Sequence, residues 1–408
     1  MRILYIHQYF CTRRGRTGTR SFEQALAMMA AGHSVTMLTS SAYLMPDELP
    51  PGGRSIRCGS IEGVEAIVLD IPYRQEMSCL RRIWSFLAFM FQSLRIAMTK
   101  RGIDLIYATS TPLTVGIAAL LAKLCRSIPF FFEVRDLWPD VPAALGILRS
   151  RWIVAAMERL EVMIYRHARL VVAVNDDVAA VIRRKTDRRK RIIVVPNACD
   201  TDLFSPDRDG TPFRREHELE GKILCVHAGA MGPVNSLEVI LDAAAALGSR
   251  DDLRFVLIGR GSRKSALQRR AQEDGLANVL FLDPIPKSEL ADVLATADVG
   301  LMTVAPIPVL EWNCANKFFD YLASGLPIVL NYQGWQAKWL AKAGCGLSAG
   351  QGDLGGFVEA IRRLMDDPKL RAEMSGRARH LAQGDLNRLK VVQPLLASLA
   401  SGRRSHRR

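Results

Sequence analysis

The stretch that decides the fold is NKFFDYLASGLPIVL, residues 316–330. Apolar residues recur at helical spacing as far as the Gly-Leu-Pro turn, and a short apolar run follows the turn. This order predicts a short helix that ends at Gly325 and then a buried strand. Asn316 can cap the helix, Lys317 follows it, and Asp320 lies one turn further along. An amide-rich helix start, a cation and a carboxylate together suit a ligand that carries both phosphate and hydroxyl groups.

Outward from this stretch, short apolar runs alternate with amphipathic helical patterns in both halves of the chain. This alternation is typical of α/β proteins with doubly wound parallel sheets, which bind ligands outside the carboxyl ends of their strands. The polar, proline-containing segment 205–221 separates two such series and reads as a linker. We therefore expect two similar sheet domains that face a cleft. The expected strands are at 3–7, 35–38, 104–108, 130–134, 170–174, 192–195, 222–227, 255–259, 279–282 and 298–301, with a hairpin-like region around 61–69.

Composition narrows the class of protein. The chain has 408 residues, 49% of them hydrophobic, and a formal net charge of +14, so it is globular and attracts anions. Its eight cysteines are scattered without zinc spacing, which indicates no metal site and a reducing compartment. The start MRILYIHQYF lacks the features of a signal peptide, and no stretch reaches the ~20 apolar residues of a membrane span. We expect a cytoplasmic protein.

The loop CTRRGRTGTR, residues 11–20, follows the first expected strand. It contains Gly18 but no GxGxxG pattern, so a dinucleotide site is weakly supported. Its arginines, Arg16 and Arg20 among them, can contact phosphate. The alternative is a solvated basic loop with no ligand.

Arg135 and Asp136 directly follow the apolar strand 130–134. Charged residues at the carboxyl end of a central strand stand where α/β enzymes keep their chemistry. Both residues are therefore catalytic candidates. The alternative is an Arg-Asp ion pair that only fixes the loop.

The segment 80–100 carries aromatic residues at helical spacing behind a pair of arginines. Two interpretations remain open: a helix that faces the core, or an interfacial helix that inserts aromatic side chains into a membrane surface. The run RRKTDRRKR, residues 183–191, is either a solvated face or a contact with anionic lipid.

In the second half, Gly229 and Gly232 lie between a strand and a helix. Backbone N–H groups on such a turn form an anion cradle, although a plain strand-to-helix connection has the same pattern. Arg260 and Arg263 follow the next strand. In DPIPKSEL, two prolines hold the backbone around Ile285 extended, which suits binding of a flat base.

The motifs GHSVTML, VPNACDTDLF, HAGAMG, FVLIGRG and NKFFDYLASGLPIV occur in this order along the chain. Together they resemble the family 4 retaining glycosyltransferases of GT-B fold, over about residues 1–385. VRDLWPD with ANKFFDYLASGLPIV is most similar to members that add acetamido sugars, such as N-acetylfucosamine, to lipid-linked O-antigen or capsule intermediates. The resemblance implies a Rossmann-like acceptor domain (1–204 plus 386–401), a Rossmann-like nucleotide-sugar domain (205–385) and a basic tail (402–408).

The resemblance also implies roles for single residues. Asp320 matches the second Glu of the family's E-x7-E motif and would bind the ribose. Trp312 stands where the first Glu is expected, so the adjacent Glu311 becomes the candidate for the donor sugar. The family's diphosphate-binding Arg and Lys are missing from AGAMGPVNSLE. Their charge would come from Lys317, Arg260, Arg263 and, from the first domain, Arg16 or Arg20.

The implied reaction moves a hexose derivative from a UDP-sugar to a lipid-linked acceptor, such as an undecaprenyl diphosphate saccharide, with retention and without metal or further cofactor. Asp136 would position the donor sugar or the acceptor. The expected partners include an anionic inner-membrane surface and exclude nucleic acid. One alternative is a UDP-N-acetylglucosamine 2-epimerase, which would use His7 and His227. Another is a protein without enzymatic activity that binds polyanions or a membrane surface.

Overall fold

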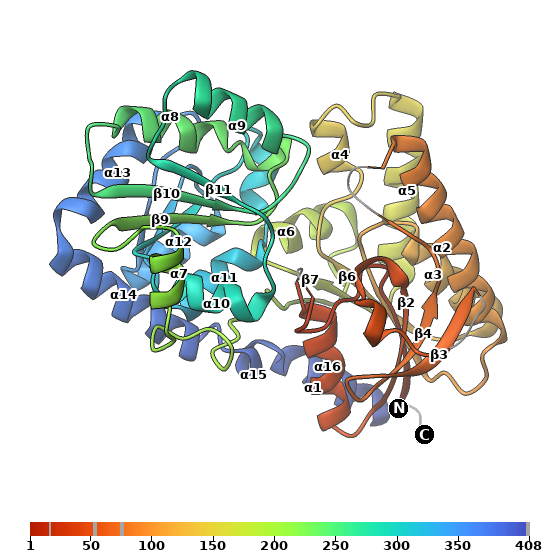
Figure 1. The fold of residues 1–408 in the computed structure, drawn as a ribbon. Coiled ribbons are helices and arrows are strands. Elements are labelled where there is room, and N and C mark those ends of the chain that lie inside the picture. The colour runs from red at the N-terminus through yellow and green to blue at the C-terminus, as the bar shows by residue number, and fades with distance from the viewer. Residues whose placement is uncertain (16–17, 52–54, 74–76, 405–408) are drawn as a thin grey trace. The chain divides into compact units, whose positions relative to one another are not determined.

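A computed structural model describes residues 1–15, 18–51, 55–73 and 77–404 (Figure 1). The chain divides into two compact units, which are Met1–Pro196 with Val391–Arg408 and Asn197–Lys390. Residues 197–204 and 386–390, which were expected in the first domain, lie in the second unit. They are held there by hydrogen bonds such as that from the Cys199 amide to the Leu386 carbonyl, at 2.9 Å.

The first unit has an eight-stranded sheet in the order β3-β4-β2-β1-β5-β6-β7-β8. All neighbouring strands are parallel except the β3–β4 hairpin. Continuous apolar runs predicted the central strands β1, β2, β5, β6 and β7, because a parallel sheet is covered on both faces. Its strands are β1 (Arg2–Ile6), β2 (Ser34–Ser40), β3 (Ile56–Ile61), β4 (Val64–Leu69), β5 (Leu105–Thr109), β6 (Phe130–Val134), β7 (Leu170–Ala173) and β8 (Ile192–Val194).

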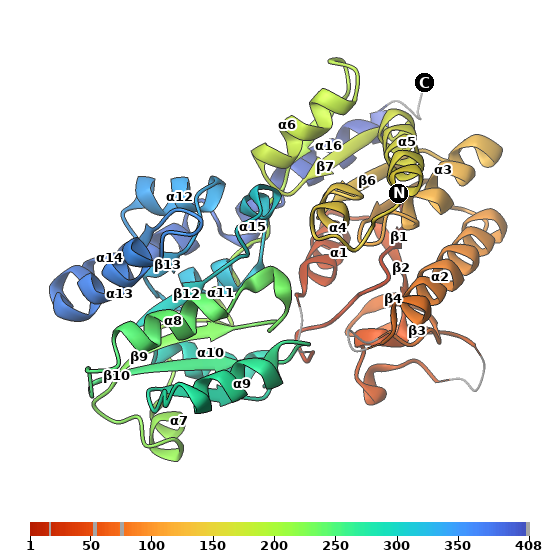
Figure 2. The same cartoon turned by 90° about the horizontal axis from the view of Figure 1, so that it is seen from above.

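Two helical layers cover this sheet. One face carries α3, which packs against both α2 and α5, and the opposite face carries α1 and the returning C-terminal helix α16 (Figure 2). Asn175 caps α6 by accepting a hydrogen bond from the Val178 amide, as the sequence predicts. The helices are α1 (Arg20–Ala30), α2 (Cys79–Thr99), α3 (Val115–Arg126), α4 (Asp140–Ala144), α5 (Arg151–His167), α6 (Asp176–Lys185) and α16 (Gln393–Arg404).

The second unit has a six-stranded, fully parallel sheet in the order β11-β10-β9-β12-β13-β14. Its strands are β9 (Ile223–Ala228), β10 (Leu253–Ile258), β11 (Val279–Leu282), β12 (Val299–Met302), β13 (Ile328–Leu330) and β14 (Gly346–Ser348). Its helices are α7 (Thr211–Glu216), α8 (Glu238–Ala246), α9 (Lys264–Glu273), α10 (Lys287–Ala295), α11 (Asn316–Ala323), α12 (Trp335–Ala343), α13 (Leu354–Asp366), α14 (Pro368–Gln383) and α15 (Arg388–Val391).

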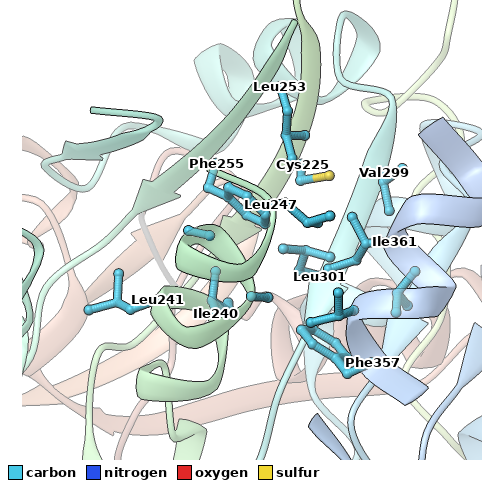
Figure 3. Packing of buried hydrophobic residues seen from close by; sticks show 14 of the residues in the cluster. Cys225, Ile240, Leu241, Leu247, Leu253, Phe255, Val299, Leu301, Phe357 and Ile361 are labelled. Carbon is cyan, nitrogen blue, oxygen red and sulfur yellow. The ribbon is translucent and has the colours of Figure 1, made fainter. Parts of the chain in front are cut away.

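The core of the second unit lies between its sheet and the helices α8 and α13. Figure 3 shows Ile240 and Leu241 of α8 and Phe357 and Ile361 of α13 beside strand residues such as Leu301, all of them buried. This packing holds the strands in register, so the loops at their carboxyl ends have a rigid base. No helix among the described residues is both long and apolar enough to cross a bilayer.

Candidate functional site

The helix α11 forms the centre of the candidate site, as its sequence indicates. Ala315 is its N-cap residue and Asn316 the first helical residue, so the expected capping by Asn316 is wrong. At the other end, Gly325 adopts φ 71°, and the Leu326 amide donates to the Tyr321 carbonyl at 2.9 Å. This left-handed glycine closure ends the helix where the sequence predicts it, because a residue with Cβ is strained in that conformation.

Lys317 places an ammonium group beside the Gly229 loop of the second unit. Its Nζ lies 3.2 Å from Nε2 of His227 and 3.5 Å from Oδ1 of Asn235. A Cβ at Gly229, where φ is 154°, would lie 3.0 Å from Cε and 3.1 Å from Nζ of this lysine. Only glycine at 229 therefore lets the ammonium lie this close to the loop without crowding.

The charge of Lys317 has no carboxylate partner among the ion pairs described for the chain. Burial lowers the pKa of Lys317 to about 7. Burial first, and then the charge of Lys317, holds the pKa of His227 well below its usual value. The imidazole is therefore neutral, and its Nε2 can accept a hydrogen bond from the ammonium group of Lys317. A desolvated cation with only neutral neighbours favours binding of an anion.

Two glycine-containing loops support this position. The Met231 amide donates to the Arg260 carbonyl at 2.9 Å, and the Arg263 amide donates to the Met231 carbonyl at 3.0 Å. A Cβ at Gly259 would lie only 1.8 Å from the Gly229 oxygen, whereas a Cβ at Gly232 would meet no atom within 4 Å. Gly259 is thus required by the contact between the loops. The open space at Gly232 is room in which a ligand can lie against the backbone.

Asp320 is buried, with 7% of its surface exposed, and its carboxylate is paired with Lys287. The Lys287 Nζ lies 3.1 Å from Oδ1 and 3.4 Å from Oδ2, and it lies 5.2 Å from the ring centre of Phe204. Burial raises the pKa of Asp320, and the charge of Lys287 opposes that rise. A paired carboxylate retains acceptor capacity, so a ligand hydroxyl can still bind it. Sequence reasoning missed Lys287, although it begins α10 directly after PIP.

The other expected residues of the second unit differ in their contacts. Arg263 donates to Glu238 at 2.7 Å and is therefore held to α8, which weakens its expected role at a diphosphate. Arg260 is exposed at the end of β10, and Ile285 is half-buried between β11 and α10. Glu311 accepts from the Gln333 amide at 3.4 Å and lies against the loop that follows β13.

In the first unit, Arg135 and Asp136 make separate contacts. Asp136 accepts from the Thr111 hydroxyl at 2.9 Å, while Nη1 of Arg135 lies 3.2 Å from Nε2 of His7. No ion pair described in the structure joins Arg135 to Asp136, so the alternative of an Arg-Asp pair finds no support. Burial, and next Arg135, lowers the pKa of His7 to about 3. A neutral His7 can accept from Arg135 through Nε2 and donate from Nδ1 to the Ser21 hydroxyl, 2.8 Å away.

Arg20 has a structural role that differs from the expected phosphate contact. Its Nη2 donates to Glu133 at 2.7 Å and to the Val195 carbonyl at 2.6 Å, and its Nη1 donates to the Pro196 carbonyl. The guanidinium is buried and committed to these partners. Gly18 lies in the loop just before α1, and Arg16 lies outside the described residues.

Glu133, which sequence reasoning missed, is the centre of this buried network. No part of its side chain is exposed, and it accepts from Arg20, Gln24 and Tyr107 through Oε1 and from Thr109 through Oε2. A glutamate inside an otherwise apolar strand, FFFEV, was the available signal, because buried charges require partners.

Comparison with known proteins places the chain in a family. Residues 17–198 match the glycosyl transferase 4-like domain, and residues 222–367 match the glycosyl transferases group 1. The chain belongs to the GT-B glycosyltransferases. Among solved structures of this fold, sucrose-phosphate synthase from Thermosynechococcus elongatus has a TM-score of 0.76 at 16% identity, covering 99% of this chain and 98% of that one. HepE from Anabaena, solved with UDP-glucose, has a TM-score of 0.71 at 16% identity, covering 98% of this glycosyltransferase and all of that chain.

Curated relatives match over a shorter part of the glycosyltransferase. The probable glycosyltransferase WbjE of Pseudomonas aeruginosa is 26% identical over 246 residues, which is 60% of this chain and 61% of WbjE. The D-inositol 3-phosphate glycosyltransferase of Corynebacterium glutamicum is 28% identical over 45% of this chain and 46% of its own length. The chain thus spans about half to three fifths of the length of these relatives.

Proposed function

We propose that this glycosyltransferase moves a hexose, N-acetylated as in the resembling transferases, from a UDP-sugar to a lipid-linked saccharide acceptor during synthesis of a surface polysaccharide. The observation that carries the proposal is the half-buried ammonium of Lys317 beside the Gly229 loop, without a carboxylate partner among the described ion pairs. The diphosphate of a nucleotide-sugar carries negative charge that can pair with this ammonium group. HepE, a protein of the same fold, was solved with UDP-glucose, which supports a nucleotide-sugar donor.

In the proposed reaction the diphosphate lies over the Gly229–Gly232 turn. The Lys317 ammonium stabilises the negative charge that grows on the leaving UDP as the glycosidic bond to the sugar breaks. Asp320 accepts hydrogen bonds from the ribose hydroxyls, and the extended backbone at Ile285 binds the base. Glu311 holds the donor sugar. No metal takes part, and the sugar keeps its anomeric configuration.

The acceptor binds the first unit in this proposal. Arg135 provides a cation at the carboxyl end of β6, and its guanidinium donates a hydrogen bond to the neutral imidazole of His7. The diphosphate of a lipid-linked acceptor suits this cation, and Asp136 positions the reacting hydroxyl. Such an acceptor lies in a bilayer, so we propose that the enzyme works at the inner membrane face.

The test is a panel of UDP-sugars incubated with undecaprenyl diphosphate saccharides. We expect transfer from one donor. NMR should show that the new linkage has the same anomeric configuration as the donor sugar, and EDTA should leave the activity unchanged. Neither transfer nor donor hydrolysis anywhere in the panel would count against the proposal. Free epimerised UDP-sugar without acceptor would favour the epimerase alternative.

The ribose contact gives a separate prediction. Replacing Asp320 by alanine should raise the dissociation constant for UDP by about one to two powers of ten, since a hydrogen bond to a charged group contributes ~1.5–3 kcal/mol. Isothermal titration calorimetry measures this change. The wild-type protein should also bind UDP more tightly than 2′-deoxy-UDP, and the variant should lose that preference.

The control for Asp320 removes both charges of the pair. Asp320→Ala alone leaves Lys287 buried without its partner, whereas Asp320→Ala with Lys287→Met leaves no unpaired charge. If the double variant discriminates UDP from 2′-deoxy-UDP as well as the wild type does, Asp320 is a structural residue and not a ribose ligand.

A further inference from the structure

The helix α2 has one buried and one exposed apolar face. Ser85, Phe89 and Ala97 are buried, so on this side the helix faces the core, as the first of the two interpretations has it. On the opposite face, an apolar stripe recurs at helical spacing and remains exposed, with Trp84 66% and Phe91 61% exposed. A helix that only packed against the core would not keep this second face. The stripe consists of Leu80, Ile83, Trp84, Leu87 and Phe91.

A second exposed apolar group lies at the start of α5 and in the connection before it. Trp152 is 86% exposed, Ile153 is 52% exposed, and Ile147 in the preceding connection is 60% exposed. These are large apolar side chains outside any described cluster of the core. Scattered single residues of this kind are ordinary on a surface, but two groups of large apolar side chains, each with an exposed tryptophan, are not scattered single residues.

Topology places the two groups at the same edge of the first unit. In a parallel sheet, a helix that follows a strand begins near the carboxyl end of that strand. α2 follows β4, and α4 and α5 follow β6, so their first turns lie at the carboxyl edge of one sheet (Figure 1). α3 packs between α2 and α5. We call Leu80, Ile83, Trp84, Leu87, Ile147, Trp152 and Ile153 the docking edge.

The two sequence segments that carry the docking edge contain basic residues and no acidic residue. Residues 77–103 contain no acidic residue and five basic residues, which are Arg81, Arg82, Arg95, Lys100 and Arg101. Residues 141–157 contain Arg149 and Arg151 and again no acidic residue. Arg81, Arg149 and Arg151 are exposed. Tryptophan with flanking arginine suits the interface of an anionic bilayer, where the ring enters the headgroup region and the guanidinium meets lipid phosphate.

From these observations we infer that the docking edge binds the surface of an anionic lipid bilayer, with Trp84 and Trp152 as its two anchors. Its use in catalysis rests on the proposed function. β6, whose carboxyl end carries Arg135, is followed by α4 and then by Ile147 and Trp152, so Arg135 and the docking edge belong to the same edge of the sheet. The run 183–191 is partly used inside the unit, since Lys185 pairs with Asp140 at 2.5 Å and Glu161 at 2.8 Å.

The test is sedimentation of the full chain with two kinds of vesicle. One kind is pure phosphatidylcholine, and in the other about one lipid in three is the anionic phosphatidylglycerol. We expect binding to the anionic vesicles that weakens in high salt. Trp84→Ala with Trp152→Ala should lower the partition coefficient on the order of 30-fold or more, since each ring removes a large apolar surface from water. Arg149→Ala with Arg151→Ala should lower it roughly 30-fold, at about 1 kcal/mol for each arginine.

Matched controls lie on the second unit. Leu354→Ala with Leu389→Ala removes exposed apolar side chains, and Arg269→Ala with Arg363→Ala removes the same charge from exposed positions. Both should bind vesicles as the wild type does. All four double variants should unfold at the wild-type temperature, because the changed side chains face outward.

Three outcomes would overturn the inference. One is vesicle binding that the docking-edge variants leave unchanged. Another is that Arg188→Ala with Arg189→Ala loses vesicle binding while Arg149→Ala with Arg151→Ala keeps it. That result would assign the lipid contact to the run 183–191. The third is a dimer, seen by light scattering, that the tryptophan variant dissociates. Transfer to a short-chain, water-soluble acceptor should survive in the docking-edge variants, so a failed transferase assay and a failed vesicle assay are distinct results.

Discussion

Replacing Lys317 by methionine should raise the dissociation constant for UDP by about 10- to 100-fold and lower kcat by about 10²- to 10³-fold. The first figure follows from losing ~1.5–3 kcal/mol of charged hydrogen bonding to the diphosphate. The second is typical of removing one preorganised group that stabilises developing negative charge. Methionine keeps the length of the side chain beside Gly229. Calorimetry with UDP and steady-state kinetics with the donor found in the panel measure the two effects.

The protonation of Lys317 gives this prediction a pH signature. Burial lowers the pKa of Lys317 to about 7, so in the free protein the ammonium is largely lost above that pH. A bound diphosphate favours the charged form and raises the pKa again. UDP affinity should therefore fall as the pH rises through about 7. At a pH near 8, binding should take up close to one proton, which calorimetry detects in buffers of different ionisation enthalpy.

Two observations separate a binding role of Lys317 from a structural one. Lys317→Arg keeps a charge at every working pH, so its UDP affinity should lose the pH dependence and the proton uptake. The folded state lowers the pKa of Lys317 below its unfolded value, so this residue contributes less stability as the pH falls toward 7. Lys317→Met should accordingly be at least as stable as the wild type at pH 7. If Lys317→Met bound UDP normally while staying folded, Lys317 would not be the diphosphate ligand.

Much of the fold was readable from local sequence. The alternation of apolar runs and helical patterns predicted both sheets, because burial of a parallel strand on two faces imposes a continuous run. Gly229 and Gly325 marked turns, since both adopt positive φ in the structure. The role of Asn316 as a cap was wrong because the connection enters the helix one residue earlier, at Ala315.

The candidate site was harder to predict, because its pairings join residues that are distant in the chain. Lys287 is 33 positions from Asp320, and Arg20 is 113 positions from Glu133. No period or spacing encodes such a pair; it follows only when the strand order brings the two elements together. Arg20 therefore resembled the other arginines of its loop, although its partner was a buried carboxylate.

That same pair carries the largest expected effect on stability. Glu133→Ala should lower the free energy of unfolding by about 3–5 kcal/mol, because it leaves the buried guanidinium of Arg20 without its carboxylate. Gln24 and Tyr107 would lose their acceptor as well. Urea denaturation at pH 7 measures the change. Glu133→Gln keeps the size and one acceptor oxygen, so it should cost less than Glu133→Ala.

The pH dependence distinguishes the charge of Glu133 from its packing. Burial alone would raise the pKa of Glu133, but Arg20, through its charge and its hydrogen bonds, lowers it to about 2. The carboxylate is thus ionised in the folded state at pH values where the unfolded chain binds a proton. Its stabilising contribution is complete above about pH 4.5 and is lost as the pH falls toward 2. The difference in unfolding free energy between the wild type and Glu133→Gln should therefore shrink by about 1 kcal/mol between pH 6 and pH 4. A difference that stays constant over that range would mean that Glu133 stabilises the first unit as a hydrogen-bond acceptor, with its charge contributing nothing.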